Sequence, residues 1–207
     1  SSPLAVTGDL TLAGPREYPA LGLHALLPAA DTPREIYLRL QTTSTRMLEL
    51  QVLPLAQALQ RDRLEELATT TYLGVLAVAL LGALVHWLRT RERVLGAFVV
   101  KQALCIGWSM ALLGYGRALL GPVLPPAWID GGTSVLVLTY VAASLFFDHE
   151  LLREYRPPRW GLWLLRGFIA LLPLELLMLA TGHASLALQL NAIVSGLAVV
   201  VLIAIVL

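Results

Sequence analysis

The stretch LALQLNAIVSGLAVVVLIAIVL, residues 186–207, contains no charged residue. A helix needs about 20 largely apolar residues to cross the roughly 30 Å hydrocarbon core of a bilayer. This stretch is long enough and is the most apolar of the chain, so it predicts a transmembrane helix. Because the sequence stops inside this apolar run and does not begin with Met, we expect a fragment that lacks residues at both ends.

Four earlier stretches also have the length and apolar character of transmembrane helices. They lie at about residues 70–88, 94–115, 129–147 and 160–181. The chain is 57% hydrophobic and only 14% charged, whereas soluble domains have about 25% charged residues. We therefore expect a mainly α membrane protein, in which residues 70–207 form a bundle of five transmembrane helices.

The arginines of the connecting segments predict the orientation of this bundle. Two links, residues 89–93 and 148–159, hold six arginines, whereas the two alternate links hold one, Arg117. Short loops rich in Lys and Arg stay on the cytoplasmic side of a membrane. Both arginine-rich links are therefore expected to be cytoplasmic, and residues 1–69 are expected to lie outside the cytoplasm.

Residues 1–69 differ from the rest of the chain, because Pro, Thr, Arg and Asp occur there at the densities of soluble proteins. Apolar and polar residues alternate at 35–41 and again at 46–53, which is the period-2 pattern of two strands in a hairpin. Residues 54–67 instead have the apolar spacing of a short amphipathic helix. We expect a small β-rich, sandwich-like segment that ends in this helix.

Composition and spacing exclude several classes of function. The formal net charge of +1 gives no basic field of the kind that binds nucleic acid. The single cysteine, Cys105, cannot form an internal disulfide, and the four histidines are scattered along the chain without metal-ligand spacing. Phosphate-binding loops, dinucleotide fingerprints and nucleophile elbows are missing. We predict no catalytic, cofactor or metal site in these residues.

Three ionisable residues inside the predicted spans are candidates for an intramembrane signal relay: Lys101, Arg166 and Glu175. Each costs about 3 kcal/mol to place in hydrocarbon, so each carries a functional hypothesis. Lys101 and Arg166 lie about two turns from an expected cytoplasmic end. The competing interpretation is that their long side chains simply extend to the headgroups.

Glu175 has a shorter side chain and needs a partner. It lies nine residues from Arg166, which is about half a turn out of phase and ~13 Å along the helix axis, so these two side chains cannot pair. A hydroxyl, a water-filled cavity, Lys101 from an adjacent helix or its own proton could neutralise it. Pro173 frees a backbone carbonyl nearby and is expected to favour a kink. A structural interhelical hydrogen bond and a role in sensing or relay both remain open.

One local cluster of polar residues, Asp148-His149-Glu150, stands at the end of the third predicted span. Three adjacent residues point in different directions on a helix, so they cannot chelate one ion together. We expect a solvated helix end here.

The order of elements resembles a bacterial family, the seven-transmembrane receptors with diverse intracellular signalling modules (7TMR-DISM). The strand Tyr37-Leu38-Arg39-Leu40-Gln41 is similar to the last strand of the family's extracytoplasmic sandwich, and Thr71-Tyr72-Leu73-Gly74 is similar to the start of its first helix. The short basic link 89–93 and Gly114-Tyr115-Gly116 also fit. The resemblance covers about residues 34–160, with weaker support to Leu207. It implies that the five spans are part of seven.

The resemblance implies a receptor in the bacterial inner membrane, with a periplasmic N-terminal segment and several passes through the bilayer. Its external ligand would be a small molecule, a carbohydrate or a protein, and a homodimer is expected. The output would be a cytoplasmic module of the diguanylate cyclase or histidine kinase type that is not present in this chain, so whether the whole protein is an enzyme stays open. The alternative function is a transporter or an accessory membrane subunit, with Lys101, Arg166 and Glu175 along a path.

Overall fold

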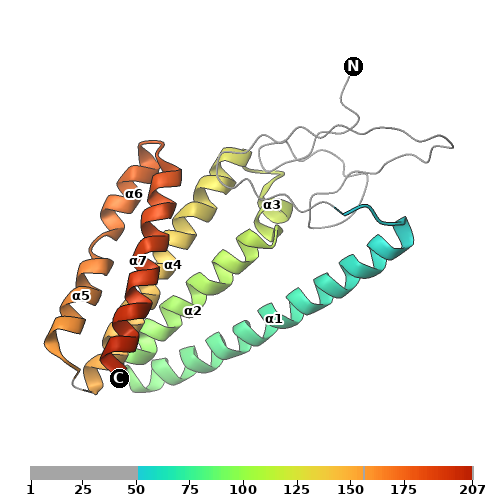
Figure 1. Ribbon diagram of the computed structural model, residues 1–207. Coiled ribbons are helices and arrows are strands. Elements are labelled where there is room, and N and C mark those ends of the chain that lie inside the picture. Colours follow the sequence, from blue (N-terminus) through green and yellow to red (C-terminus); the bar gives the residue numbers. More distant parts are fainter. Residues whose placement is uncertain (1–50, 156, 207) are drawn as a thin grey trace.

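The computed structural model describes residues 51–155 and 157–206, and in this part of the chain the secondary structure is entirely helical (Figure 1). Five helical segments are long and apolar enough to cross a membrane. The prediction of a mainly helical protein with five spans is confirmed. The two expected strands fall almost wholly on residues 1–50, outside the described part, so the β-rich segment stays a prediction.

In chain order, the helices are α1 (Leu55–Thr90), α2 (Arg93–Leu112), α3 (Tyr115–Leu120), α4 (Pro126–Glu154), α5 (Arg159–Ile169), α6 (Leu172–Ala180) and α7 (Ala184–Val206).

Helix α1 is a single helix of 36 residues. The sequence predicted a separate amphipathic helix at 54–67 followed by a span at 70–88, but no break separates them. Near the expected boundary, the hydroxyl of Thr71 donates to the carbonyl of Leu67 in the preceding turn, 2.8 Å away. At 1.5 Å per residue the helix is about 54 Å long, well over the ~30 Å thickness of the hydrocarbon.

The link between α1 and α2 is a tight corner. Arg91 has a left-handed backbone (φ 56°) and its N–H donates to the carbonyl of Trp87, which caps α1. The Arg91 guanidinium lies 5.1 Å from the centre of the Trp87 ring. The indole also lies against Gly96, where an added Cβ would lie 2.7 Å from Trp87 Nε1. Trp87 therefore fills the space between the two helices at their junction.

Helix α4 is the centre of the bundle. It packs against α2 and α3 on one side and against α5, α6 and α7 on the other, while α1 packs on α2. Figure 1 shows α1 leaning away from the other helices toward its N-terminal end. Accordingly, α1 has no buried residue, whereas Leu138, Ala142 and Leu145 of α4 are buried.

The apolar core lies between α4, α5 and α7. Its fully packed members are Leu145, Leu165, Val194 and Ala198, surrounded by partly buried apolar side chains from the same helices. The contact between α5 and α7 is close, because a Cβ at Gly161 would overlap Ile205 Cδ1.

Helices α5 and α6 together make the fourth span, with an interruption between them. Ala170 and Leu171 keep right-handed helical backbone angles but do not continue the regular helix. Pro173 accounts for this, because proline lacks an N–H and its ring displaces the carbonyl four residues earlier. The kink that the sequence predicted near Pro173 is thus present as a two-residue interruption.

Two ends of the bundle can be distinguished. The links between α1 and α2 and between α4 and α5 lie at the same end, together with the C-terminus of α7 (Figure 1). We call this the arginine-rich end, after Arg89, Arg91, Arg93, Arg153 and Arg159. The short helix α3 and the turn between α6 and α7 lie at the opposite end.

Candidate functional site

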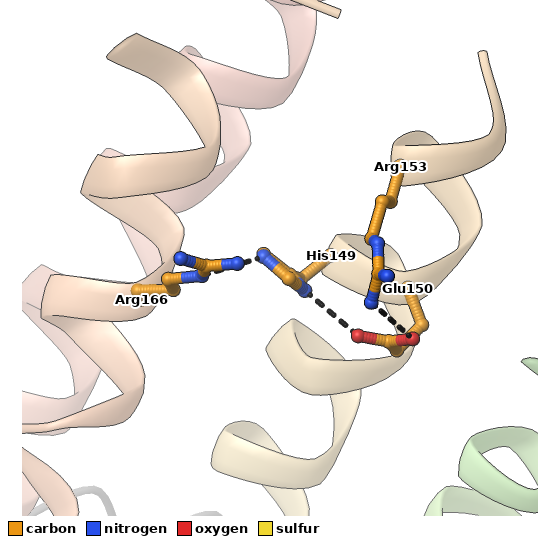
Figure 2. A network of polar contacts seen from close by, with 4 residues as sticks. All are labelled: His149, Glu150, Arg153 and Arg166. Atoms are coloured by element: carbon orange, nitrogen blue, oxygen red, sulfur yellow. Dashed lines mark hydrogen bonds and ion pairs between the residues drawn. The ribbon is translucent and has the colours of Figure 1, made fainter. Parts of the chain in front are cut away.

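A chain of polar contacts joins α4 to α5 near the arginine-rich end (Figure 2). Arg166 Nε donates a hydrogen bond to His149 Nε2 at 3.0 Å, and His149 Nδ1 lies 3.2 Å from Glu150 Oε1. The other carboxylate oxygen of Glu150 is 3.6 Å from Arg153 Nη1. The four side chains form a continuous path from the exposed end of α4 to Arg166 on α5. We call this set the His149 network.

The direction of the hydrogen bonds fixes the tautomer of His149. An arginine guanidinium can only donate, so Nε2 of His149 accepts and carries no proton. In the neutral ring the proton is then on Nδ1, which donates to Glu150. If His149 were doubly protonated, its Nε2–H would face the Arg166 N–H and that hydrogen bond would be lost.

The expectation of a solvated helix end at 148–150 is wrong for its last two residues. His149 is only 4% exposed and the Glu150 side chain 11%. They are covered because α5 folds back against the end of α4, a packing that the local pattern of three polar residues does not reveal. Arg166 itself remains exposed, with its guanidinium 5.7 Å from the centre of the Trp163 ring.

A second polar contact joins α6 to α7. Asn191 Nδ2 donates to Glu175 Oε2 at 3.1 Å, and both residues are buried, at 5% and 2% exposure. The other oxygen, Glu175 Oε1, is inaccessible to solvent and makes no hydrogen bond within the described part of the chain. Within the described residues, Glu175 therefore has only one of its two carboxylate oxygens hydrogen-bonded in the protein interior.

Asn191 was missed by the sequence analysis. Of the candidate partners considered for Glu175, none was the asparagine amide that the structure provides. The signal was present, because Asn191 is one of three polar residues, with Gln189 and Ser195, in the most apolar span. Polar side chains in transmembrane helices commonly bond across to a neighbouring helix. The interhelical hydrogen bond considered for Glu175 is the arrangement observed.

Lys101 lies between α2 and α4. Its Nζ is 4.7 Å from the centre of the Phe147 ring, which makes a cation–π contact, and Phe98 meets the same ring edge to face at 5.6 Å. Asp148, the residue after Phe147, interacts electrostatically with Lys101. The ammonium is thus held by residues of α4.

The interface of α2 with its neighbours contains further polar and aromatic residues that were not singled out. The rings of Trp108 and Tyr140 stack at 5.1 Å between α2 and α4. Buried Gln102 reaches α1, with its amide nitrogen 3.5 Å from the carbonyl of Leu76. These contacts tie the first three spans together without forming a charged cluster.

The three predicted relay residues lie in three separate interfaces. Lys101 faces α4 from α2, Arg166 contacts α4 from α5, and Glu175 contacts α7 from α6. Within residues 51–155 and 157–206, no hydrogen bond, ion pair or ring contact joins any two of the three. In the same part of the chain, histidine, cysteine, aspartate and glutamate do not gather in a group of three that could hold a metal ion.

Comparison with known proteins identifies the family. No curated protein and no solved structure matches the chain. The family model described as 7TM diverse intracellular signalling matches residues 65–207, well over half of the chain. The match starts later than the resemblance found from motifs, within the first third of α1, and extends through α7. The chain therefore belongs to the 7TMR-DISM family of multi-pass membrane receptors with intracellular signalling.

Proposed function

We propose that these residues are the transmembrane part of a sensory receptor in the bacterial inner membrane. The receptor couples a signal received outside the cytoplasm to a cytoplasmic output module of the diguanylate cyclase or histidine kinase type. Family membership supports the receptor role. Residues 1–69 would carry the external sensing function, and a small molecule, a carbohydrate or a protein would be the ligand.

The orientation proposed for this receptor follows from its arginines. The arginine-rich end is cytoplasmic and the end with α3 is periplasmic, since short basic loops are retained on the cytoplasmic side. In this orientation the Glu175–Asn191 contact lies in the periplasmic half of the bundle and the His149 network lies in the cytoplasmic half.

The observation that carries the relay hypothesis is the placement of the two polar contacts on the two halves of one interrupted span. Glu175 holds α6 to α7, and Arg166 holds α5 to α4. The interruption at Ala170 and Leu171 lies between them. If α6 moved against α7, the interruption would transmit the movement to α5 and change its packing angle on α4. The contact of Lys101 with Phe147 of α4 would then change as well.

Signalling requires two packings of the bundle, and the ligand must prefer one of them. Buried polar pairs suit such a switch, because each has a small number of discrete arrangements, unlike a uniform apolar interface. The proposed receptor works as a homodimer, so that a change in helix packing can alter the distance or angle between two output modules.

The test uses the full-length gene product. Its coding sequence is read for an output domain, and the purified protein in nanodiscs is assayed for second-messenger synthesis or autophosphorylation. We expect Asn191→Leu to change the basal output at least severalfold, because it breaks the contact between α6 and α7. Gln189→Leu is the matched control, since Gln189 is an exposed polar residue of the same helix. Absence of any signalling output, or equal effects of the two variants, contradicts the proposal.

A further inference from the structure

Three residues of α5 lie on one face of the helix near the arginine-rich end: Arg159, Trp163 and Arg166. Their spacing of four and three residues places them within about 60° of one another around the helix axis. All three are exposed, and Trp163 is 69% exposed. We call this set the α5 basic face.

The α5 basic face has no acidic residue of its own helix to neutralise it, because α5 contains neither Asp nor Glu. On neighbouring α4, the carboxylate of Glu150 is already engaged by Arg153 and His149, and Asp148 interacts with Lys101. Glu154 is exposed at the end of α4. Within the described residues, neither Arg159 nor Arg166 makes an ion pair with a carboxylate.

The Arg166 guanidinium is held in a fixed orientation. Its Nε donates to buried His149, and its plane lies near the Trp163 ring. The two terminal nitrogens, a planar pair of donors, make no hydrogen bond to another described residue. Such a fork matches two oxygens of a phosphate group.

The depth of the face fits the boundary between hydrocarbon and headgroups. Arg166 is about 10 Å along the axis from Arg159, the first residue of α5. Side chains on a helix tilt toward its N-terminus, which for α5 is the arginine-rich end, so the Arg166 side chain extends back toward the membrane surface. Trp163, with Trp160 beside it at 49% exposure, occupies the position typical of interfacial tryptophans.

We propose that the α5 basic face binds the phosphate group of an anionic phospholipid such as phosphatidylglycerol. Arg159 and Arg166 bind the phosphate oxygens, and Trp163 packs against the adjoining glycerol and upper acyl chain. The bound lipid contacts the same arginine that holds His149, so its binding is linked to the α4–α5 contact. This proposal stands independently of any output module.

Native mass spectrometry tests the proposal on the protein released from nanodiscs of phosphatidylglycerol and phosphatidylethanolamine. We expect wild-type protein to retain phosphatidylglycerol selectively. The double variant R159Q/R166Q should reduce the apparent affinity about fivefold for each arginine removed, given that a basic residue near an anionic surface contributes about 1 kcal/mol. R89Q/R93Q removes the same charge from the other arginine-rich link and should cause a clearly smaller loss, because it leaves the α5 basic face intact.

Two further measurements keep the proposal falsifiable if Arg166→Gln disturbs folding. R159Q alone leaves the His149 contact intact and should still weaken phosphatidylglycerol binding about fivefold. Inorganic phosphate added in excess should not displace the lipid, because the acyl chain and Trp163 contribute to binding. Equal retention by wild type and R159Q, equal losses in R159Q/R166Q and R89Q/R93Q, or full displacement by inorganic phosphate would overturn the proposal.

Discussion

The two polar contacts on the fourth span differ in how completely they are satisfied. In the His149 network each ring nitrogen of His149 has a partner and both oxygens of Glu150 are engaged. In the Glu175–Asn191 pair one carboxylate oxygen has no partner in the described part of the chain. The network also reaches the exposed surface through Arg153, whereas the pair is enclosed. We call the His149 network the graded link because it is open to solvent and lipid at one end. The Glu175–Asn191 pair is isolated inside the bundle, so it is either formed or broken.

The largest effect is expected where α5 touches α7 beside the His149 network. Gly161→Val should lower the free energy of unfolding by about 1–3 kcal/mol, because the added side chain has to displace Ile205 from a packed contact. The measurement is unfolding by sodium dodecyl sulfate in mixed micelles. Gly167→Val is the control, since a Cβ at Gly167 meets nothing within 4 Å. A similar loss in both variants would show that helix propensity, and not the α5–α7 contact, sets the cost.

Breaking the enclosed pair should have an effect of comparable size. Asn191→Leu leaves Glu175 buried without its donor, at a cost of about 1–3 kcal/mol in the free energy of unfolding. Glu175→Gln keeps an acceptor oxygen for Asn191 and should cost much less. The double variant E175L/N191L removes both polar groups and should recover part of the loss, which a double-mutant cycle measures. If E175Q and N191L are equally destabilised, the carboxylate itself is needed and the pair is more than a hydrogen bond.

Removing the hydrogen bond of the graded link should cost less. Arg166→Gln is expected to lower the free energy of unfolding by about 0.5–1.5 kcal/mol, the range for one hydrogen bond, because Arg166 is exposed and water replaces part of the contact. Histidine NMR reports the local result directly: the chemical shift of His149 Nε2 should change on loss of its donor, while the Glu150 carboxylate keeps the proton on Nδ1. An unchanged Nε2 shift in R166Q would contradict the assignment of Arg166 as donor to Nε2.

The smallest effect is expected at the exposed end of the network. Arg153→Ala should change the free energy of unfolding by at most about 0.5 kcal/mol, because the Arg153 side chain is 52% exposed and its contact to Glu150 is long. Raising the salt concentration should remove even that difference. A loss of more than 1 kcal/mol by the same detergent titration would mean that Arg153 orders the whole network.

The five membrane spans could be predicted from the sequence because each depends only on the composition of its own residues. About 20 apolar residues identify a membrane helix wherever its neighbours lie, and Pro173 marked the interruption. The continuity of α1 was not recognised because residues 54–67 are polar enough to suggest a separate element, while nothing in them ends a helix.

The site could be predicted only in part, because it depends on which helices are neighbours. Glu175 and Arg166 were identified from their cost in hydrocarbon, and the geometry of one helix correctly excluded a pair between them. Their actual partners, Asn191 and His149, lie on other helices. The burial of His149 follows from the packing of α5 on α4, which no periodicity in residues 148–150 encodes.

The length of α1 gives it the geometry of a lever. With 36 residues and no interruption, it extends about 54 Å from the corner at Arg91. Turning it by 10° about that corner would move its far end by about 9 Å. Conversely, if the segment that precedes Leu55 is displaced by several ångströms, α1 rotates by a few degrees about the α1–α2 corner. Trp87 packs against Gly96 at this corner, so this contact would change even on so small a rotation.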